Sequence, residues 1–201
     1  MLRGRFITLE GGEGSGKSTQ ARLLADAIGT RGHEVVLTRE PGGTAGAEAI
    51  RSLLVSGETD RWTPWSEALL MTAARVDHVA RVIRPALERG AMVICDRYVD
   101  STRAYQGAGH GLSDAVLTQL HADAVGLWPD LTLVFQLDEA EGLARAAARG
   151  GDARFEAFGR EFHARINGFF AELPALDPAR CRAIDASGSV ADVAARIMAV
   201  L

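Results

Sequence analysis

Close to the N-terminus of this chain, residues 11–18 read Gly-Gly-Glu-Gly-Ser-Gly-Lys-Ser and fit the pattern G-x-x-x-x-G-K-[ST]. The apolar residues 6–10 before them predict a buried strand, and residues 19–28 after them carry apolar side chains at a helical spacing. In such a strand–loop–helix unit, loop N–H groups and the helix N-terminus surround phosphate oxygens. We therefore predict a nucleoside triphosphate site, formed by Gly11, Gly12, Glu13, Gly14, Ser15, Gly16, Lys17, Ser18 and Thr19.

Two side chains of this segment carry the expected chemistry. Lys17 supplies a compact cation for the β- and γ-phosphates of the nucleotide. The Ser18 hydroxyl is an oxygen ligand for Mg²⁺. A glycine-rich turn with a solvated lysine is the alternative, and the flanking strand and helix argue against it.

Four further strand-like runs, at residues 34–38, 91–95, 131–135 and 181–185, alternate with helical patterns. The longest helical pattern begins at Pro64, and Pro85 is expected to end or kink it. The pattern predicts an α/β fold of the three-layer P-loop NTPase type, with a five-stranded parallel sheet covered by helices on both faces. No repeat, low-complexity tract or linker divides residues 1–201, so we expect one domain.

Composition excludes several classes of partner and location. The formal net charge is −4, so the chain has no electrostatic footprint for duplex DNA, and we expect no nucleic-acid partner. No apolar run approaches 18 residues, so we expect neither a transmembrane helix nor a membrane partner. Cys95 and Cys181 lie far apart in the sequence without metal-ligand spacing, which favours a reducing cytoplasm.

The lysine content separates the classes of nucleotide-binding protein. Lys17 is the only lysine beside 21 arginines. A GTPase would need an Asn-Lys-x-Asp segment to read guanine, and a partitioning-type ATPase usually has a second lysine at the start of the loop. The sequence therefore favours a small nucleotide kinase in which arginines contact the phosphates.

A second group of polar residues, Asp96-Arg97-Tyr98, follows the third predicted strand. Ligands of parallel sheets lie beyond the carboxyl ends of the strands, so these residues should face the glycine-rich loop. Asp96 can hold the hydration shell of Mg²⁺, and Arg97 can pair bidentately with a phosphate. Taken alone, the Asp-Arg pair is also compatible with a local salt bridge at a turn, and the Glu40-Pro41-Gly42-Gly43 segment with a simple turn.

Taken together, these segments resemble the bacterial thymidylate kinase family over essentially the full length. The resemblance rests on residues 6–19, on Thr-Arg-Glu-Pro-Gly-Gly-Thr at 38–44, on Ala-Ala-Arg at 73–75, on Asp-Arg-Tyr at 96–98 and on Ala-Tyr-Gln-Gly at 104–107. It implies phosphorylation of dTMP to dTDP with ATP and Mg²⁺, and it implies a homodimer. A kinase acting on thymidine itself and a non-catalytic nucleotide switch are the rival functions.

The resemblance also implies roles for single residues. Glu13 matches the residue that binds the sugar 3′-hydroxyl, Arg97 and Arg51 match ligands of the acceptor phosphate, and Arg75 matches the reader of thymine. The remaining residues implied for the acceptor pocket are Glu40, Pro41, Met71, Thr102, Tyr105 and Gln106. Met71 stands where the family usually has a phenylalanine that stacks on thymine, so we expect weaker stacking on the same base.

Residues 145–156 fall where the family has its mobile lid. In this family an arginine of the P-loop or of the lid reaches the transferred phosphoryl group. Here Gly14 follows Glu13, so the lid must supply it, and the candidates are Arg145, Arg149 and Arg154. Arg149 precedes the flexible pair Gly150-Gly151, which favours it as the catalytic one, whereas Arg154 is expected in an exposed ion pair with Glu156.

Overall fold

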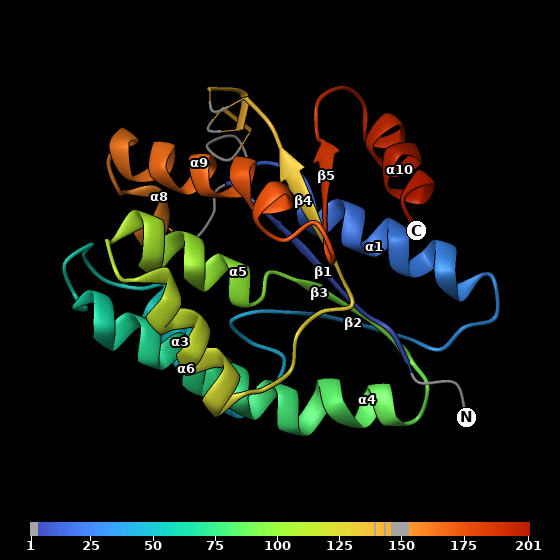
Figure 1. Ribbon diagram of the computed structural model, residues 1–201, viewed down its shortest axis with the longest axis horizontal. Coiled ribbons are helices and arrows are strands. Elements are labelled where there is room, and N and C mark those ends of the chain that lie inside the picture. Colours follow the sequence, from blue (N-terminus) through green and yellow to red (C-terminus); the bar gives the residue numbers. More distant parts are fainter. Residues whose placement is uncertain (1–3, 139, 143, 146–152) are drawn as a thin grey trace.

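A computed structural model describes residues 4–138, 140–142, 144–145 and 153–201 of the chain (Figure 1). Five parallel strands form one sheet in the order β2-β3-β1-β4-β5. They are β1 (Phe6–Gly11), β2 (Val35–Arg39), β3 (Met92–Asp96), β4 (Leu131–Gln136) and β5 (Cys181–Asp185). The predicted α/β class and the five-stranded parallel sheet are confirmed.

The helical segments connect these strands and cover both faces of the sheet (Figure 1). They are α1 (Lys17–Gly29), α2 (Ala45–Leu54), α3 (Pro64–His78), η1 (Val79–Ile83), α4 (Arg84–Glu88), α5 (Val99–Thr102), η2 (Arg103–Gly109), α6 (Asp114–Ala124), α8 (Ala153–Glu156), α9 (Arg160–Leu176) and α10 (Val190–Ala199). Among the described residues, no helix is both long and apolar enough to cross a membrane.

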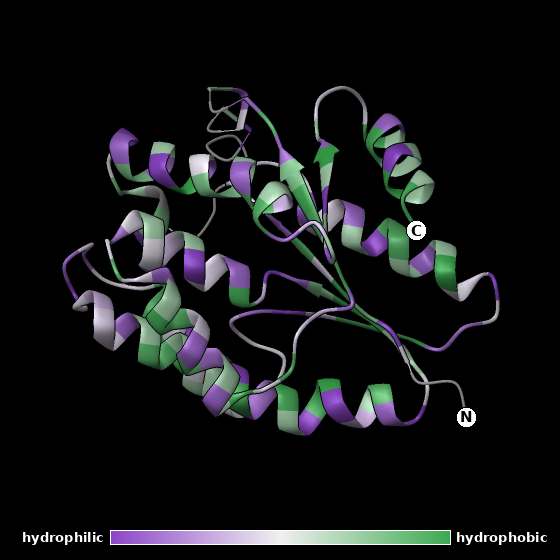
Figure 2. Ribbon diagram, viewed as in Figure 1, coloured by the Kyte–Doolittle hydropathy of each residue, from purple (hydrophilic) through white to green (hydrophobic). Residues whose placement is uncertain are grey.

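Successive side chains of a strand point to opposite faces of the sheet, so the hydrophobic core is divided between the two faces. Ile7 and Leu9 of β1 pack in one cluster with apolar side chains of α1 and α10. Phe6, on the opposite face of the same strand, packs with η1, α4 and α5, and Val134 of β4 packs with η2 and α9. Figure 2 shows hydrophobic residues along the central strands, as expected for strands covered on both sides.

Local sequence signals explain where several helices begin. Thr44 caps α2 by accepting from the N–H of Ala47, and Thr63 caps α3 in the same way just before Pro64. Ser189 and Asp192 form a capping box at the start of α10.

The long helix that begins at Pro64 changes its winding before Pro85. It is α-helical to His78, π-helical over Val79–Ile83, and α-helical again from Arg84. The helix does not end at Pro85, since it continues to Glu88. Because proline has no N–H to continue the hydrogen-bond ladder, the winding changes to this π segment just before it. A second π segment, η2, contains Tyr105 and Gln106, which lie at the site described next.

Candidate active site

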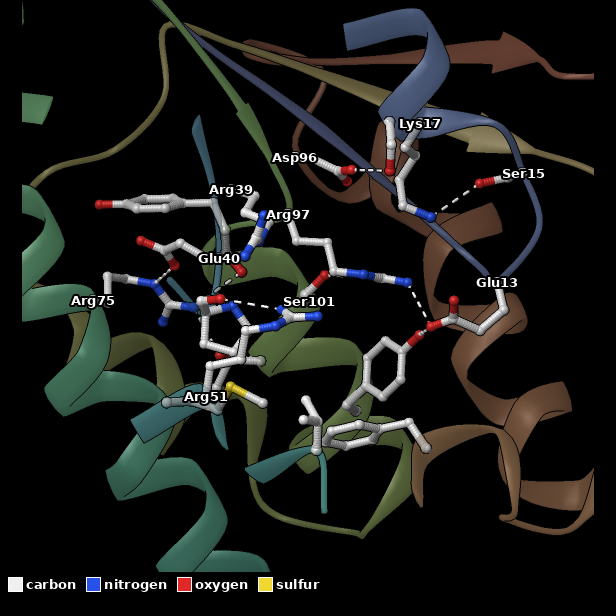
Figure 3. Close-up of a pocket in the computed structure, with 18 of the residues that line it drawn as sticks. Glu13, Ser15, Lys17, Arg39, Glu40, Arg51, Arg75, Asp96, Arg97 and Ser101 are labelled. Carbon is white, nitrogen blue, oxygen red and sulfur yellow. Dashed lines mark hydrogen bonds and ion pairs between the residues drawn. The ribbon is translucent and has the colours of Figure 1, made fainter. Parts of the chain in front are cut away.

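A cavity of about 280 Å³ opens at the carboxyl ends of β1, β2 and β3 (Figure 3). All ten residues expected to contact the acceptor nucleotide line it: Glu13, Glu40, Pro41, Arg51, Met71, Arg75, Arg97, Thr102, Tyr105 and Gln106. Gly14, Ser15, Gly16, Lys17, Ser18 and Asp96 also line it, so the glycine-rich loop and the acceptor residues share one cavity. Of the predicted nucleotide site, Gly11, Gly12 and Thr19 do not line this cavity, and Gly12 lines a smaller one behind the loop.

The glycine-rich loop needs glycine for its backbone shape. Gly14 and Gly16 have φ values of 69° and 86°, and Gly16 is the N-cap of α1. Gly11 passes so close to β4 that an added Cβ would lie 2.6 Å from the Phe135 carbonyl oxygen. These positions let the loop curl between the strand and the helix, which is the shape that directs N–H groups toward an anion.

Lys17 lies over this loop. Its ammonium Nζ donates to the carbonyl oxygens of Gly11 and Gly12 at 3.0 and 2.6 Å and to Ser15 Oγ at 3.0 Å. Burial, together with the nearby charge of Arg97, lowers the pKa of Lys17 to about 8. The side chain is therefore still mainly a cation at pH 7.

Ser18 and Asp96 meet where α1 begins and β3 ends. The Ser18 hydroxyl donates to Asp96 Oδ2 (Figure 3). A hydroxyl and a carboxylate are hard oxygen ligands of the kind that suit Mg²⁺, which keeps several of its own waters. Among the described residues, no group of three or more His, Cys, Asp or Glu side chains could hold a metal ion. The chemistry of Ser18 and Asp96, a hydroxyl beside a carboxylate, fits such a Mg²⁺ ion.

Arg97 occupies the centre of the cavity with a strained backbone. Its φ is 67°, a left-handed value that side-chain-bearing residues rarely adopt. Its guanidinium donates to Glu13 Oε1 at 2.7 Å and to Ser101 Oγ and the Gly11 carbonyl oxygen at 3.1 Å each. Although burial opposes the charge, Tyr105 and Glu13 raise the pKa of Arg97, so it is a permanent cation facing the loop.

Glu10, at the end of β1, holds the turn that carries Arg97. Its carboxylate accepts from the N–H of Tyr98 at 2.7 Å and from Ser101 Oγ at 2.6 Å. Burial and the nearby Asp100 raise the pKa of Glu10 to about 7. Sequence reasoning missed this role, because nothing local links Glu10 to a turn 88 residues away.

Arg75 lies at the far end of the cavity and is almost fully buried. Its Nε donates to Glu40 Oε2 at 2.6 Å, and its Nη2 donates to Thr102 Oγ1 at 3.0 Å. The other Glu40 oxygen pairs with His78 Nδ1 at 3.0 Å, and His78 Nε2 lies 2.7 Å from Thr38 Oγ1. Glu40 therefore lines the cavity and also holds Arg75 in place, in a buried network to which His78 belongs.

The comparisons with known proteins agree on one family. The thymidylate kinase family model matches residues 9–197. The chain is 53% identical to the thymidylate kinase of Caulobacter vibrioides, over all of this chain and 97% of that one. It is 52% identical to that of Rhizorhabdus wittichii, over all of this chain and 98% of that one. The chain belongs to the thymidylate kinase family.

A solved structure supports the same assignment at the level of the fold. The crystal structure of thymidylate kinase from Ehrlichia chaffeensis superposes with a TM-score of 0.80 at 33% identity, covering 98% of each chain. The resemblance stated from the sequence motifs is therefore confirmed, and with it the assignment to the phosphotransferases.

The lid expected from the thymidylate kinase resemblance lies only partly within the described residues. Arg149, the favoured catalytic arginine, lies outside them. Arg145 pairs with Glu141 four residues earlier, and its Nη1 reaches the Ala186 carbonyl oxygen at 3.4 Å.

The expectation for Arg154 is wrong. Arg154 is buried, not exposed, and its Nη1 lies 2.5 Å from Glu67 Oε2 in α3. It also donates to the carbonyl oxygens of Leu54, Glu58 and Thr59 at 3.0–3.1 Å. The pattern around residue 154 could not reveal this, because its partners come from a segment about 90 residues earlier in the chain.

Several lining residues of this thymidylate kinase cavity were not singled out from the sequence. They are Arg39, Val55, Ser101 and Phe155. Phe155 follows the anchored Arg154, and its ring meets that of Tyr105 edge-on at 5.7 Å. The segment that carries Phe155 therefore closes one side of the cavity that holds the acceptor residues.

Proposed function

We propose that this protein transfers the γ-phosphoryl group of ATP to dTMP, giving ADP and dTDP. The observation that carries the proposal is one cavity that joins Lys17 of the glycine-rich loop to Arg97, Arg51 and Arg75. Phosphoryl transfer depends mainly on positioning two anions and neutralising the charge between them. A cavity lined by this lysine and by arginines suits that task.

The glycine-rich loop forms the donor side. Lys17 supplies a cation to the β- and γ-phosphates of ATP, and the loop N–H groups surround them. Ser18 and Asp96 are the residues that would hold Mg²⁺. When bound, the ion neutralises charge that builds between the two nucleotides.

The opposite wall forms the acceptor side. Arg97 and Arg51 hold the dTMP phosphate, and Glu13 accepts from the sugar 3′-hydroxyl. Arg75 donates to an oxygen of thymine, with Thr102 and Gln106 as further polar contacts and Met71, Pro41 and Tyr105 as the surrounding wall. No protein nucleophile is needed, because an oxygen of the acceptor phosphate attacks and is largely ionised at neutral pH.

A lid arginine completes the site, and we assign this role to Arg149. Arg154 is held by Glu67 and three carbonyl oxygens, and Arg145 is held by Glu141 and Ala186. The contacts of Arg154 and Arg145 hold both side chains elsewhere. Arg149 is the remaining candidate, and the sequence already favours it because it precedes Gly150-Gly151. The segment 145–156 would then act as the lid of a single kinase domain spanning residues 1–201.

We also infer a homodimer. Trp65, Leu69 and Val76 lie on α3 at helical spacing and are 40–53% exposed in one chain. Leu53 of α2 and Val116 of α6 are likewise exposed apolar side chains. A second copy would cover this apolar stripe along α3.

A cytoplasmic location agrees with the proposed activity. ATP is the proposed phosphoryl donor, and the described thiols Cys95 and Cys181 are both buried and unbridged. Such thiols suit a reducing compartment.

Release of ADP, measured with and without dTMP, tests the proposed function. A dTMP kinase releases ADP rapidly only when dTMP is present, with one dTDP formed for each ADP. A nucleotide switch would hydrolyse ATP at the same rate in both samples, and that result would refute the proposal.

A further inference from the structure

Glu67 of α3 is a buried carboxylate that touches three polar side chains. Its Oε1 accepts from Gln106 Nε2 at 2.7 Å, and its Oε2 accepts from Arg154 Nη1 at 2.5 Å. His110 Nε2 lies 3.5 Å from Oε1. Glu67 is 1% exposed, so these side chains rather than water satisfy its charge.

The carboxylate is ionised. Although burial raises the pKa of Glu67, hydrogen bonds from His110, Gln106 and Arg154 outweigh that effect and hold the pKa below its ordinary value. An ionised carboxylate can only accept hydrogen bonds. Gln106 must therefore present its NH₂ group to Glu67.

This contact decides which end of the Gln106 amide remains for a ligand. With the NH₂ group held by Glu67, the carbonyl oxygen Oε1 is left, and it is buried without a hydrogen-bond partner among the described residues. Gln106 lines the same cavity as Arg75, which can only donate. The wall therefore combines a fixed acceptor with a fixed donor.

We propose that Glu67 is a positioning residue that selects the base, by holding the Gln106 amide with its carbonyl oxygen as the group offered to the nucleotide. This inference rests on the proposed function and deepens it. Thymine presents an N3–H donor beside the O4 acceptor, and it matches an acceptor at Gln106 and a donor at Arg75. Cytosine presents an N3 acceptor and an N4–H₂ donor, so both contacts are mismatched.

Arg154 makes the arrangement sensitive to a single substitution. In Glu67→Gln, the new amide must turn its carbonyl oxygen to Arg154, because a guanidinium can only donate. Its NH₂ group then faces Gln106, whose amide must reverse to accept from it. The reversed Gln106 offers an NH₂ group to the base, which opposes thymine N3–H and suits cytosine N3.

The test compares two nucleotides that differ only in the pattern read by these residues, dTMP and 5-methyl-2′-deoxycytidine 5′-monophosphate. Their dissociation constants are measured by calorimetry, without ATP, for wild type and Glu67→Gln. We expect the preference for dTMP to fall at least about tenfold in the variant. A preference that stays at the wild-type value, with both affinities lowered equally, would mean that Glu67 is merely structural and would overturn the inference.

Two further variants keep the test decisive if Glu67→Gln does not fold. Gln106→Met leaves the Arg154–Glu67 pair intact and removes the acceptor, so it should also lower the preference for dTMP, and an unchanged preference would count against the inference. The exchange Glu67→Gln with Gln106→Glu keeps the net charge, lets the new amide at position 67 donate to the new carboxylate at position 106, and restores an acceptor facing the base. We expect the preference for dTMP to return in this double variant, and failure to return would count against the inference.

The design separates this inference from the proposed function. If wild type binds neither nucleotide, or binds both without preference, the proposed function fails. If wild type prefers dTMP and releases ADP in response to it while Glu67→Gln keeps that preference, only the role of Glu67 fails.

Discussion

Replacing Arg154 by methionine removes a guanidinium that joins α8 to α3 and to the segment after α2. The substitution leaves the Glu67 carboxylate buried without its charged partner, which was 2.5 Å away. Breaking a buried ion pair from one side costs about 3–5 kcal/mol. Three carbonyl oxygens, of Leu54, Glu58 and Thr59, also lose their donor, at about 1 kcal/mol each where water does not replace it.

Methionine recovers part of this loss through burial of its own apolar surface, about 2 kcal/mol. The expected fall in the free energy of unfolding is therefore about 4–6 kcal/mol, a large share of the ~5–15 kcal/mol typical of a domain. Urea unfolding of wild type and Arg154→Met, followed by circular dichroism, measures it.

Two comparisons make this result specific. Arg160→Met, at an exposed arginine that begins α9, should change the stability by less than about 0.5 kcal/mol. Adding Glu67→Gln to Arg154→Met should recover about 1 kcal/mol, because it removes the uncompensated buried charge. A loss below about 1 kcal/mol in Arg154→Met would refute the reasoning, since an exposed surface pair would give that value.

Four other substitutions test the site and the core. Lys17→Ala should abolish phosphoryl transfer in a steady-state assay, while its affinity for dTMP, measured by calorimetry, stays near that of wild type. If the variant kept more than about a tenth of the wild-type activity, the loss of transition-state stabilisation would be below about 1.4 kcal/mol and would contradict the role of Lys17. Arg97→Lys should also lose most of its kcat, because an ammonium cannot reproduce the planar fork, and near-normal turnover would place Arg97 outside the site. Arg149→Ala should lower kcat about 10³-fold with little change in the KM for dTMP, whereas Arg145→Ala should not; full kcat in Arg149→Ala would refute the assignment. His121→Phe should make the protein less sensitive to acid. Burial lowers the pKa of His121 to about 4, so below pH 6.5 the unfolded chain binds a proton that the folded protein does not. The free energy of unfolding of the wild type therefore falls as the pH falls. Between pH 6.5 and 5 that loss should be about 2 kcal/mol smaller in the variant, and equal losses in thermal unfolding of both proteins would contradict it.

Local signals in the sequence predicted the elements of the sheet well. The fifth predicted strand, residues 181–185, matches β5, and the helix predicted to begin at Pro64 begins there as α3. The reason is that strands buried on both faces and capped helices leave their signature in neighbouring residues. For the helix that contains Pro85, the sequence predicted an end or a kink, and the structure has a π segment there. A proline shows where the helical hydrogen bonds are interrupted, but it does not show how the backbone rearranges around the interruption.

The residues behind the site could not be predicted in the same way. His78 ends α3 and is buried against Glu40, a contact that no neighbouring residue in the sequence indicates. Nothing in the sequence distinguishes Glu67 from an ordinary helical glutamate, because Arg154 and Gln106 lie beside it only in the folded chain. These contacts join residues 38–87 positions apart, and no periodicity or motif in a single sequence specifies such pairs.

The measurement that tests the central claim most directly is a comparison of dTMP with thymidine as the phosphoryl acceptor, at saturating ATP and Mg²⁺. Arg97 and Arg51 line the acceptor side of the cavity. The phosphate of dTMP is an anion that these two arginines can bind, and thymidine has no such group. The account predicts that kcat/KM for dTMP exceeds that for thymidine by at least about 10³-fold, the scale of two lost charge-assisted contacts. Equal kcat/KM values for the two acceptors would contradict it.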